Sequence, residues 1–287
     1  MIAILKHELK SYFHSLTAYV FGAFLLVITG VGAMLYNIQA AVSNFEYVLS
    51  FGSIVFVVIV PILTMRSIAE ERKQKTDQLL YSLPITTTQI ILGKYLALLA
   101  VFAVPMVLIC YYPVVFSRFG DVYLPTAYGS LFAFFLMGAA WIAVGVFVSS
   151  LTENQGFAAG IGVGVILLNY YGVSLSEYVS STATSSLVAI TVLIVLVVLI
   201  LRNLTKNDLV SFGTGIVLLA ALMITYLTGT QRLEGLLPGI MTRLSLFKQF
   251  ERFVDGVFDL TSVVFFLSVI VFFLFLSVQS LEKRRYN

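Results

Sequence analysis

Charged residues are scarce in this chain of 287 residues. They make up 11% of the sequence, where a soluble domain carries about 25%, while 60% of the residues are hydrophobic and the mean hydropathy is +1.01. So few charges cannot cover the surface of a water-soluble protein of this size, which excludes a soluble globular enzyme, a disordered chain and a nucleic-acid-binding domain. The single cysteine, Cys110, excludes a disulfide framework and a cysteine-based metal cluster. These absences leave a polytopic membrane protein.

The apolar runs set the fold class. They are about 20 residues long, the length of a helix that crosses a bilayer, whereas a transmembrane β-barrel needs alternating strands of about ten residues. We predict an all-α polytopic membrane protein with one transmembrane domain over residues 1–287. The eight predicted spans are 17–36, 47–65, 95–116, 127–149, 156–173, 186–201, 209–227 and 261–281.

The basic residues predict the orientation, because cytoplasmic loops carry an excess of Lys and Arg. Eight spans place both termini on one side, and that side holds twelve of the 17 bases. These are Lys6, Lys10, Arg66, Arg72, Lys73, Lys75, Lys94, Arg202, Lys206, Lys283, Arg284 and Arg285. The opposite side holds Arg118, Arg232, Arg243, Lys248 and Arg252. We therefore expect cytoplasmic termini, with the first apolar run retained as a helix because it is longer than the core of a signal peptide.

The predicted spans lack the groups that several membrane chemistries need. None carries an ionisable residue near its centre, which argues against a proton- or ion-coupled carrier. The only histidines, His7 and His14, lie in the N-terminal segment, so an intramembrane metalloprotease would have no ligands. Gly93-Lys94 lacks the remaining residues of a phosphate-binding loop. If the protein uses ATP, another chain must bind it.

Residues 1–14 have the pattern of an amphipathic helix. Such a helix lies flat in the cytoplasmic interface of the lipid bilayer, with its lysines near anionic headgroups. The alternative is an ordinary segment flanking the first span. The apolar side comprises Ile2, Leu5, Leu9, Tyr12 and Phe13, and the other side Lys6, His7, Lys10 and His14.

Residues 66–94 are the densest charged stretch. We predict a helix over 66–83, a stop at Pro84 and a second helix capped by Thr86 and Thr87, all on the cytoplasmic face. The stretch is either a solvated loop or a docking element whose charges pair with a partner protein. As a helix, it directs Ile68, Leu79, Leu80 and Leu83 towards the membrane or the protein, and Glu70, Glu71, Arg72, Lys73 and Asp77 towards the cytoplasm.

Four strings of residues carry a resemblance to a known family. I-A-E-E-R-K-x-x-T-x-x-L-L-x-x-L-P-x5-I-x-L-G-K (68–94) resembles the cytoplasmic element of ABC-2 type transporter permeases. I-L-K-x-E-L-K-S-Y-F (4–13), S-S-L-T-E-N-Q (149–155) and F-x-x-F-x-x-G-V-x-D-L (250–260) are similar to the gliding-motility and nitrous-oxide-associated branch of that family.

The resemblance implies roles for these segments. Residues 1–14 would be an interfacial elbow helix, and 66–83 the coupling helix that fits a cleft in a separate ATP-binding subunit. A dimer of that ATPase would bind ATP and Mg, so this chain would hold no cofactor and no metal. A second permease copy or paralogue would complete the path. The implied docking residues are Glu70, Glu71, Arg72, Lys73, Lys75, Thr76, Asp77, Leu79, Leu80, Leu83 and Pro84.

The chain departs from the family pattern at three points. Members usually have Gly-Thr-Glu where this chain has Lys75-Thr76-Asp77, which adds a charge and removes the flexibility of glycine. Most members have a core of six spans, so 186–201 and 209–227 form an extra pair. Members often have a basic residue before the Gly-Val pair, where this chain has Asp255.

Two further features are candidate contact sites. Gly156, Gly160 and Gly164 lie four residues apart, a pattern that lets another helix approach closely, either within the subunit or in a permease dimer. Glu153 and Asn154 precede this stripe, where they are expected to cap the helix and to offer the ATPase a second contact.

The loop 228–260 is long enough to hold one or two amphipathic helices on the outer side. They would rest on the outer leaflet, or alternatively serve as a gate or a platform for an auxiliary membrane or extracytoplasmic subunit. The predicted apolar face comprises Ile240, Leu244, Phe247, Val254 and Val257.

The leading hypothesis is the permease subunit of an ATP-driven exporter in a bacterial cell membrane, which is not itself an enzyme. Its rivals are a secondary transporter or channel, and a non-transporting platform of an envelope or surface machinery. The first rival needs polar or broken helices at mid-membrane depth, where the sequence offers little beyond Pro61 and Pro105.

Overall fold

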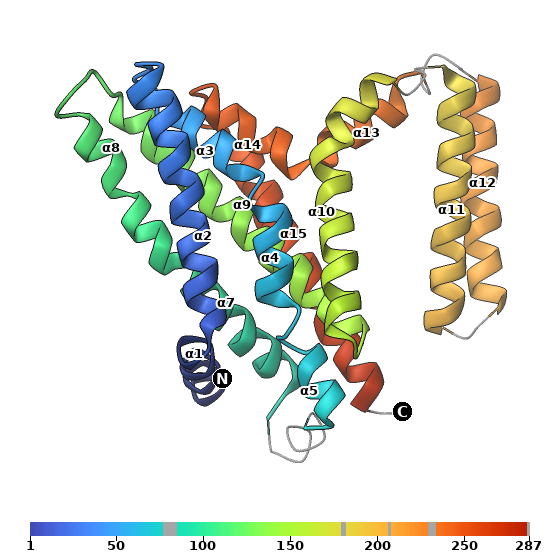
Figure 1. The fold of residues 1–287 in the computed structure, drawn as a ribbon. Helices are drawn as coiled ribbons and strands as arrows, with labels where there is room; N and C mark the ends of the chain where they lie inside the picture. The colour runs from blue at the N-terminus through green and yellow to red at the C-terminus, as the bar shows by residue number, and fades with distance from the viewer. Residues whose placement is uncertain (77–84, 179–181, 206–207, 229–233, 286–287) are drawn as a thin grey trace. The chain divides into compact units, whose positions relative to one another are not determined.

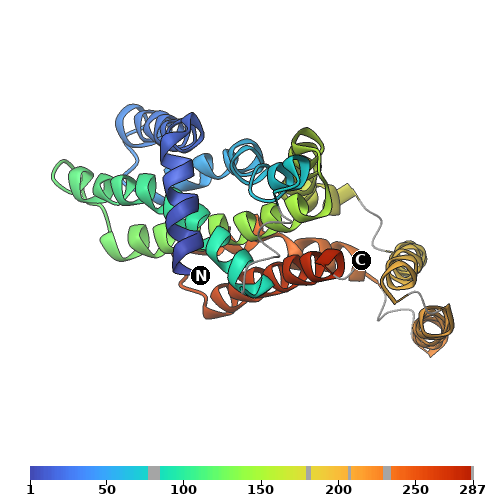
Figure 2. The same cartoon turned by 90° about the horizontal axis from the view of Figure 1, so that it is seen from below.

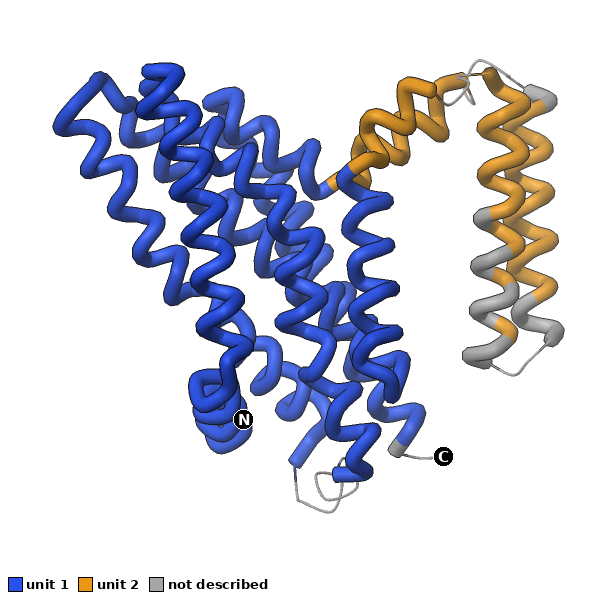
Figure 3. Tube along the Cα trace, in the orientation of Figure 1, with its two compact units in different colours: residues 1–170, 246–287 blue, residues 171–245 orange. Residues whose placement is uncertain are grey.

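The computed structural model describes residues 1–76, 85–178, 182–205, 208–228 and 234–285, and every regular element in these ranges is helical. The chain divides into two compact units (Figure 3). Unit 1 comprises residues 1–170 and 246–287, and unit 2 comprises residues 171–245. The all-α prediction is confirmed for the described ranges.

Unit 1 contains the long helices of the predicted core (Figure 1). Before the first charged stretch these are α1 (Ile2–His14), α2 (Leu16–Ala33), the π-helix η1 (Met34–Gln39), α3 (Glu46–Ser53) and α4 (Phe56–Thr64). The following elements are α5 (Ala69–Gln74), α7 (Thr87–Ile109), α8 (Tyr111–Phe116) and α9 (Leu124–Leu151). The last elements are α10 (Gln155–Tyr178), which runs on into unit 2, α14 (Leu246–Val254) and α15 (Leu260–Arg285).

Five helices in the described ranges are long and apolar enough to cross a membrane, or six if a bent pair counts as one span. The bent pair joins 46–53 to 56–74 at an angle of 59° and matches the predicted second span. The other candidates match the predicted first, third, fourth, fifth and eighth spans. A six-span core is therefore compatible with the helices, while the predicted total of eight is not confirmed.

The bend between α3 and α4 has a local cause in the backbone. Across the break, Val55, Val57 and Val58 donate to the carbonyl three residues earlier instead of four, which tightens the turn. Pro61 then follows within α4 and has no amide hydrogen to offer Val57. The predicted second span thus consists of two helices set at an angle, which the sequence signalled only through its proline.

Helix α9 is the centre of unit 1, and two glycines let its neighbours approach. A Cβ on Gly138 would lie 2.5 Å from the ring of Phe102 in α7, and one on Gly145 would lie 2.2 Å from Oγ1 of Thr64 in α4. Trp141, between them, is fully buried. Because no side chain fits at either glycine without displacing its neighbour, the packing of α4 and α7 on α9 depends on both.

Segments far apart in sequence meet at one end of unit 1 (Figures 1 and 2). Helix α1 lies across the ends of the long helices, and α5 and the C-terminal end of α15 lie at the same end. An extended residue, Ser15, separates α1 from α2 and turns the chain. Helix α14 lies at the opposite end of unit 1. The predicted cytoplasmic segments therefore share one end of the unit.

Unit 2 holds the predicted extra pair and one short helix. Its elements are α11 (Ala183–Thr205), α12 (Asp208–Thr228) and α13 (Leu236–Leu244). A Cβ on Gly215 of α12 would lie 2.6 Å from Val198 of α11, so the pair packs closely there, and the Arg202 guanidinium lies 5.6 Å from the centre of the Phe212 ring. The apolar stretches that are described, 183–192 and 212–226, are shorter than a span.

The predicted helices of the 228–260 loop exist as α13 and α14, but the predicted apolar face is only partly matched, since Phe247 is buried and other members are not. Extended backbone at Ser245 separates the two helices, so one helical period cannot run through both. The buried face of α14 comprises Leu246, Phe247, Gln249, Phe250 and Phe253, while Leu244 and Val257 are exposed. This face packs on α9 and α3, so α14 is a part of the protein body.

Candidate functional site

A cleft of about 630 Å³ separates α1 from α5 at the end of unit 1 where the predicted cytoplasmic segments meet. Its walls include Glu8 and Tyr12 from α1 and Glu70 and Glu71 from α5, and Lys94 of α7 contributes to its lining. Burial, reinforced by the neighbouring carboxylates of which Glu8 is the strongest, raises the pKa of Tyr12 above its usual range. The Tyr12 hydroxyl is therefore neutral at physiological pH.

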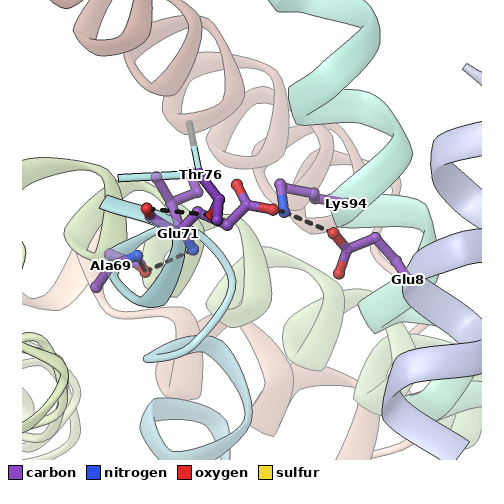
Figure 4. Close-up of polar contacts among 7 residues, drawn as sticks. Glu8, Ala69, Glu71, Thr76 and Lys94 are labelled. Atoms are coloured by element: carbon purple, nitrogen blue, oxygen red, sulfur yellow. Dashed lines mark hydrogen bonds and ion pairs between the residues drawn. The ribbon is translucent and has the colours of Figure 1, made fainter. Parts of the chain in front are cut away.

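A buried ammonium joins three helices beside this cleft (Figure 4). The Lys94 Nζ donates to Glu8 Oε1 of α1 at 2.6 Å and to Glu71 Oε1 of α5 at 2.6 Å. The side chain of Lys94 is 2% exposed, that of Glu8 12% and that of Glu71 26%. We call Glu8, Glu71 and Lys94 the charge cluster.

Burial makes the removal of any one member of the charge cluster costly in free energy. A buried ion pair loses much of its attraction to the cost of desolvation, but removal of one partner leaves an uncompensated charge at a cost of about 3–5 kcal/mol. Lys94 has three donors, and two of them are directed to carboxylates on different helices. The positions of α1 and α5 are therefore tied to the same group on α7.

The glycine before Lys94 has a packing role. A Cβ on Gly93 would lie 3.0 Å from Cγ2 of Ile4 and 3.4 Å from the carbonyl oxygen of Met1. A side chain at this position would crowd α1, so the glycine favours the close approach of α1 to α7 that brings Glu8 to Lys94. Lys94 lies two turns inside α7, within the second helix that the sequence predicted for the 66–94 stretch.

A hydroxyl fastens the start of α5 to the end of α9. Ser149 Oγ accepts from the amides of Ile68, at 3.2 Å, and Ala69, at 3.1 Å, and donates to the carbonyl of Met65 at 3.2 Å. The hydroxyl thereby uses its donor and both of its acceptor sites. Ile68 is the N-cap residue of α5 and offers no side-chain cap, so Ser149 supplies the missing acceptor from a different helix.

The predicted coupling helix over 66–83 is interrupted at Lys75. Helix α5 ends at Gln74, and Lys75 adopts a left-handed backbone with φ of 57°. The amide of Thr76 then bonds to the carbonyl of Glu71 at 3.0 Å, which closes the helix end. Lys75 thus has the left-handed backbone that glycine adopts most readily, at the position where the family pattern has a glycine. Asp77, Leu79, Leu80, Leu83 and Pro84 lie outside the described residues.

The predicted outward direction holds for only part of α5. Glu71 turns inward to Lys94, and Arg72 is buried at 6% exposure, both against the prediction. Glu70 lies on the exposed side, 3.9 Å from Arg66, and Lys73 is also exposed. The prediction failed because helical periodicity gives no information about Lys94, the cationic partner of Glu71, which lies 23 residues further along the chain. The predicted burial of Ile68 is confirmed.

The second candidate contact, at the turn between α9 and α10, is built as a helix cap. Asn154 Oδ1 accepts from the amides of Gly156, at 2.9 Å, and Phe157, at 3.3 Å, which confirms its capping role. Glu153 does not share this role, since its carboxylate accepts from Arg284 of α15 at 2.6 Å. Thr86 caps α7 as predicted, while Thr87 instead donates to Glu282 of α15 at 2.8 Å.

The glycine stripe of α10 does not form a seam in unit 1. No described atom outside the helix lies within 4 Å of a Cβ built on Gly160 or Gly164, and Gly156 approaches only its own cap residue. The close contact is made by Gly162, whose Cβ would lie 3.2 Å from Pro61. The intrasubunit version of the prediction is therefore wrong for Gly160 and Gly164, because these residues and Gly162 face different sides of α10.

Neutral hydrogen bonds hold α14 at the opposite end. Asn169 of α10 accepts from the amide of Leu246 at 3.0 Å, and Ser130 of α9 donates to the carbonyl of Phe253 at 2.8 Å. Ser262 of α15 donates to Gln249 at 2.8 Å. These bonds give a partner to one backbone group at each end of the helix and to its one buried amide side chain.

Exposed ion pairs surround α14. A hydrogen bond to Glu251 raises the pKa of Lys248, and a hydrogen bond from the Arg252 guanidinium lowers the pKa of Asp259 to about 2. Because the pKa of Asp259 is lowered, its contribution to stability is present at neutral pH and is lost as the pH falls towards 2. The side chains of Lys248, Glu251 and Arg252 are about half exposed and that of Asp259 is 18% exposed, so solvent screens both pairs, the second one less.

The described helices define a multi-pass helical membrane protein with a polar, charge-bearing end. The family model described as "ABC-2 family transporter protein" matches residues 27–230, so the chain belongs to the ABC-2 transporter family. It is a membrane permease component of an ABC transporter, a class that works with ABC ATPases in general. No curated protein matches the chain.

Sequence reasoning missed the two contacts that organise the site. Glu8 and Ser149 lie within the strings that carry the family resemblance, yet neither had a predicted role. A lysine directly before an apolar run was the available signal, because a charge at the edge of a span needs a partner. Nothing local to the sequence identifies Glu8 and Glu71 as those partners.

Proposed function

We propose that this chain is the permease subunit of an ATP-driven exporter and that α5 receives the mechanical input from a separate ATPase dimer. The observation that carries the proposal is the fastening of α5 to Lys94 of α7, which also holds Glu8 of α1, together with the hydrogen bonds of α5 to Ser149 of α9. A short helix held by a buried charge pair transmits an applied force to the helix that carries the partner charge.

The mechanism needs no catalytic residue in this chain. ATP and Mg bind to the ATPase subunits, whose closure moves the cleft that receives α5. The permease has two conformations, and the ATPase shifts their populations by binding one of them more tightly. The force passes directly to α4, which precedes α5, and through Lys94 to α7. These helices line or support the pathway, which a second permease copy or paralogue completes.

The exposed side of α5 is the docking face. Glu71 and Arg72 are held inward, so the ATPase meets Glu70, Lys73 and Lys75. Thr76 follows directly, at the end of the described segment. Asn154 and Glu153 lie on the turn between α9 and α10 and offer a second contact.

The end of unit 1 that bears α1 and α5 is the cytoplasmic end. Lys6, Lys10, Arg66 and Lys73 lie there, and an excess of basic residues marks the cytoplasmic side of membrane proteins. The strings at 4–13 and 250–260 favour the gliding-motility and nitrous-oxide-associated branch of the family. We infer a bacterial cell membrane as the location, with α13 and α14 available to an auxiliary extracytoplasmic subunit.

Co-purification of the ATPase tests this function. The wild-type chain, extracted in mild detergent, is expected to retain an ATP-hydrolysing subunit. The double variant Lys73→Glu with Lys75→Glu should lose that subunit while the permease keeps its unfolding temperature, since both side chains are exposed. The matched control is Lys248→Glu at the opposite end, which should retain the subunit. Equal recovery from wild type and double variant would remove α5 as the docking element.

A further inference from the structure

We propose that Lys94 is a positioning residue that makes α1 and α5 move as one body against α9 when the ATPase acts. The inference rests on the proposed function and adds to it that the elbow helix is a working part of the transmission. It also identifies the contact that gives way, which is the Ser149 junction.

The first argument is the strength of the two sets of bonds on α5. The bonds from Lys94 to Glu8 and Glu71 are charge-assisted and short, at 2.6 Å each. The three bonds of Ser149 are between neutral groups and measure 3.1–3.2 Å. Charge-assisted hydrogen bonds are roughly twice as strong as neutral ones. Bond for bond, the Glu71–Lys94 contact therefore holds α5 more strongly than any single hydrogen bond of Ser149 does.

The second argument is the cost of leaving either contact unmade. If Glu71 moved away alone, Lys94 would keep one partner and a carboxylate would be left in a partly buried position. If Ser149 loses α5, the groups left without this partner are the neutral amides of Ile68 and Ala69. An unpaired neutral amide costs less in a buried position than an unpaired charge does.

The third argument is the steric fit of α1 on α7. Gly93 places Ile4 within 3.0 Å of where a Cβ would stand, so α1 is seated on the same turn of α7 that carries Lys94. Helix α1 thus contacts the start of α7 through both packing and charge. The start of α7, α1 and α5 form one body with the charge cluster inside it.

Distances between spin labels test the inference in the complex with its ATPase. Labels are attached to cysteines at Lys10 of α1, Gln74 of α5 and Leu151 of α9, all exposed, in a Cys110→Ala background. On addition of a non-hydrolysable ATP analogue, the 74–151 distance is expected to change while the 10–74 distance stays the same. A 10–74 distance that changes in this background overturns the inference.

Neutral variants of the charge cluster give the second readout. Glu8→Gln, and independently Glu71→Gln, should make the 10–74 distance respond to the nucleotide, whereas a merely structural role would leave it constant and only lower the unfolding temperature. Glu251→Gln, in the exposed pair with Lys248, is the matched control and should change nothing. A constant 10–74 distance in both cluster variants would contradict the inference.

The two proposals fail differently. A 74–151 distance that ignores the nucleotide, in a complex that hydrolyses ATP, would mean that α5 does not move against α9 and would overturn this inference, whereas the proposed function falls only if the Lys73→Glu, Lys75→Glu variant keeps its ATPase subunit. A changing 74–151 distance accompanied by a changing 10–74 distance would leave the proposed function intact and overturn the inference alone.

Discussion

The two ends of unit 1 are stabilised by different kinds of interaction. At the end with α1 and α5, a buried ammonium shared by Glu8 and Glu71 joins three helices beside a polar cleft. At the opposite end, α14 packs Phe247 and Phe250 against aromatic rings of α9 and is fastened by neutral hydrogen bonds. Aromatic packing loses its energy at small displacements, whereas a charge pair acts over a longer range. The first end can move as linked bodies, and the second resists displacement.

The largest expected effect comes from removing the shared charge. Lys94→Met leaves two carboxylates in the cluster without their cation and should lower the free energy of unfolding by about 3–5 kcal/mol. The measurement is denaturant unfolding in detergent micelles. The triple variant with Glu8→Gln and Glu71→Gln added removes every charge and should recover most of the loss. If the triple variant stays equally unstable, packing holds this end instead of charge.

A comparable loss is expected at the opposite end, but by a different mechanism. Phe250 is 1% exposed, and its ring centre lies 5.8 Å from that of Phe134 in α9. Phe250→Ala should lower the free energy of unfolding by about 3–5 kcal/mol, because the cavity cannot be refilled. Val257→Ala, at an exposed position of the face predicted from sequence, is the control and should have almost no effect. The reverse ranking would mean that α14 rests on lipid and not on α9.

A smaller effect is expected at the junction between α5 and α9. Ser149→Ala removes one donor and two acceptor sites and should cost about 1–3 kcal/mol. Faster amide exchange at Ile68 and Ala69 would locate the loss. Ser150→Ala is the matched control, because that hydroxyl donates only within its own helix, to Phe147 at 2.7 Å. Equal losses in the two variants would show that the Ser149 contacts do not fasten α5.

The smallest effect is a gain at the end of α5. Lys75 holds a left-handed backbone, which costs a residue with a side chain about 1 kcal/mol relative to glycine. Lys75→Gly should therefore raise the free energy of unfolding by about that amount. Lys75→Ala removes the charge but keeps the backbone cost, so it should bring no gain. An equal gain from alanine would assign the effect to the charge.

The sequence predicted the fold better than the site. Apolar runs and Thr86 carry local information, and the predicted six-span core is compatible with the candidate spans of the structure. The extra pair corresponds to α11 and α12, although their described apolar stretches do not establish two further spans. Helical periodicity failed in the 228–260 loop because it assumed one continuous face across Ser245.

The candidate site could be predicted only as a segment. The charged stretch 66–94 identified α5, but the partners of Glu71 and of the α5 amides come from residues 23 or more positions away. Such contacts depend on how α1, α7 and α9 pack, and the glycines that allow this packing look like ordinary small residues in the sequence. The packing roles of Gly93 and Gly145 become clear only from the structure, in which Ile4 packs on Gly93 and Thr64 packs on Gly145.

Crosslinking to the ATPase tests the central claim most directly, because it asks which of the two ends meets the energy source. In the Cys110→Ala background, Lys73→Cys on α5 and Glu251→Cys on α14 are each treated with a bifunctional thiol–amine reagent in intact membranes. The account predicts a permease–ATPase product from Lys73→Cys and none from Glu251→Cys. A product from Glu251→Cys, or its absence from Lys73→Cys in membranes that retain the ATPase, would contradict it.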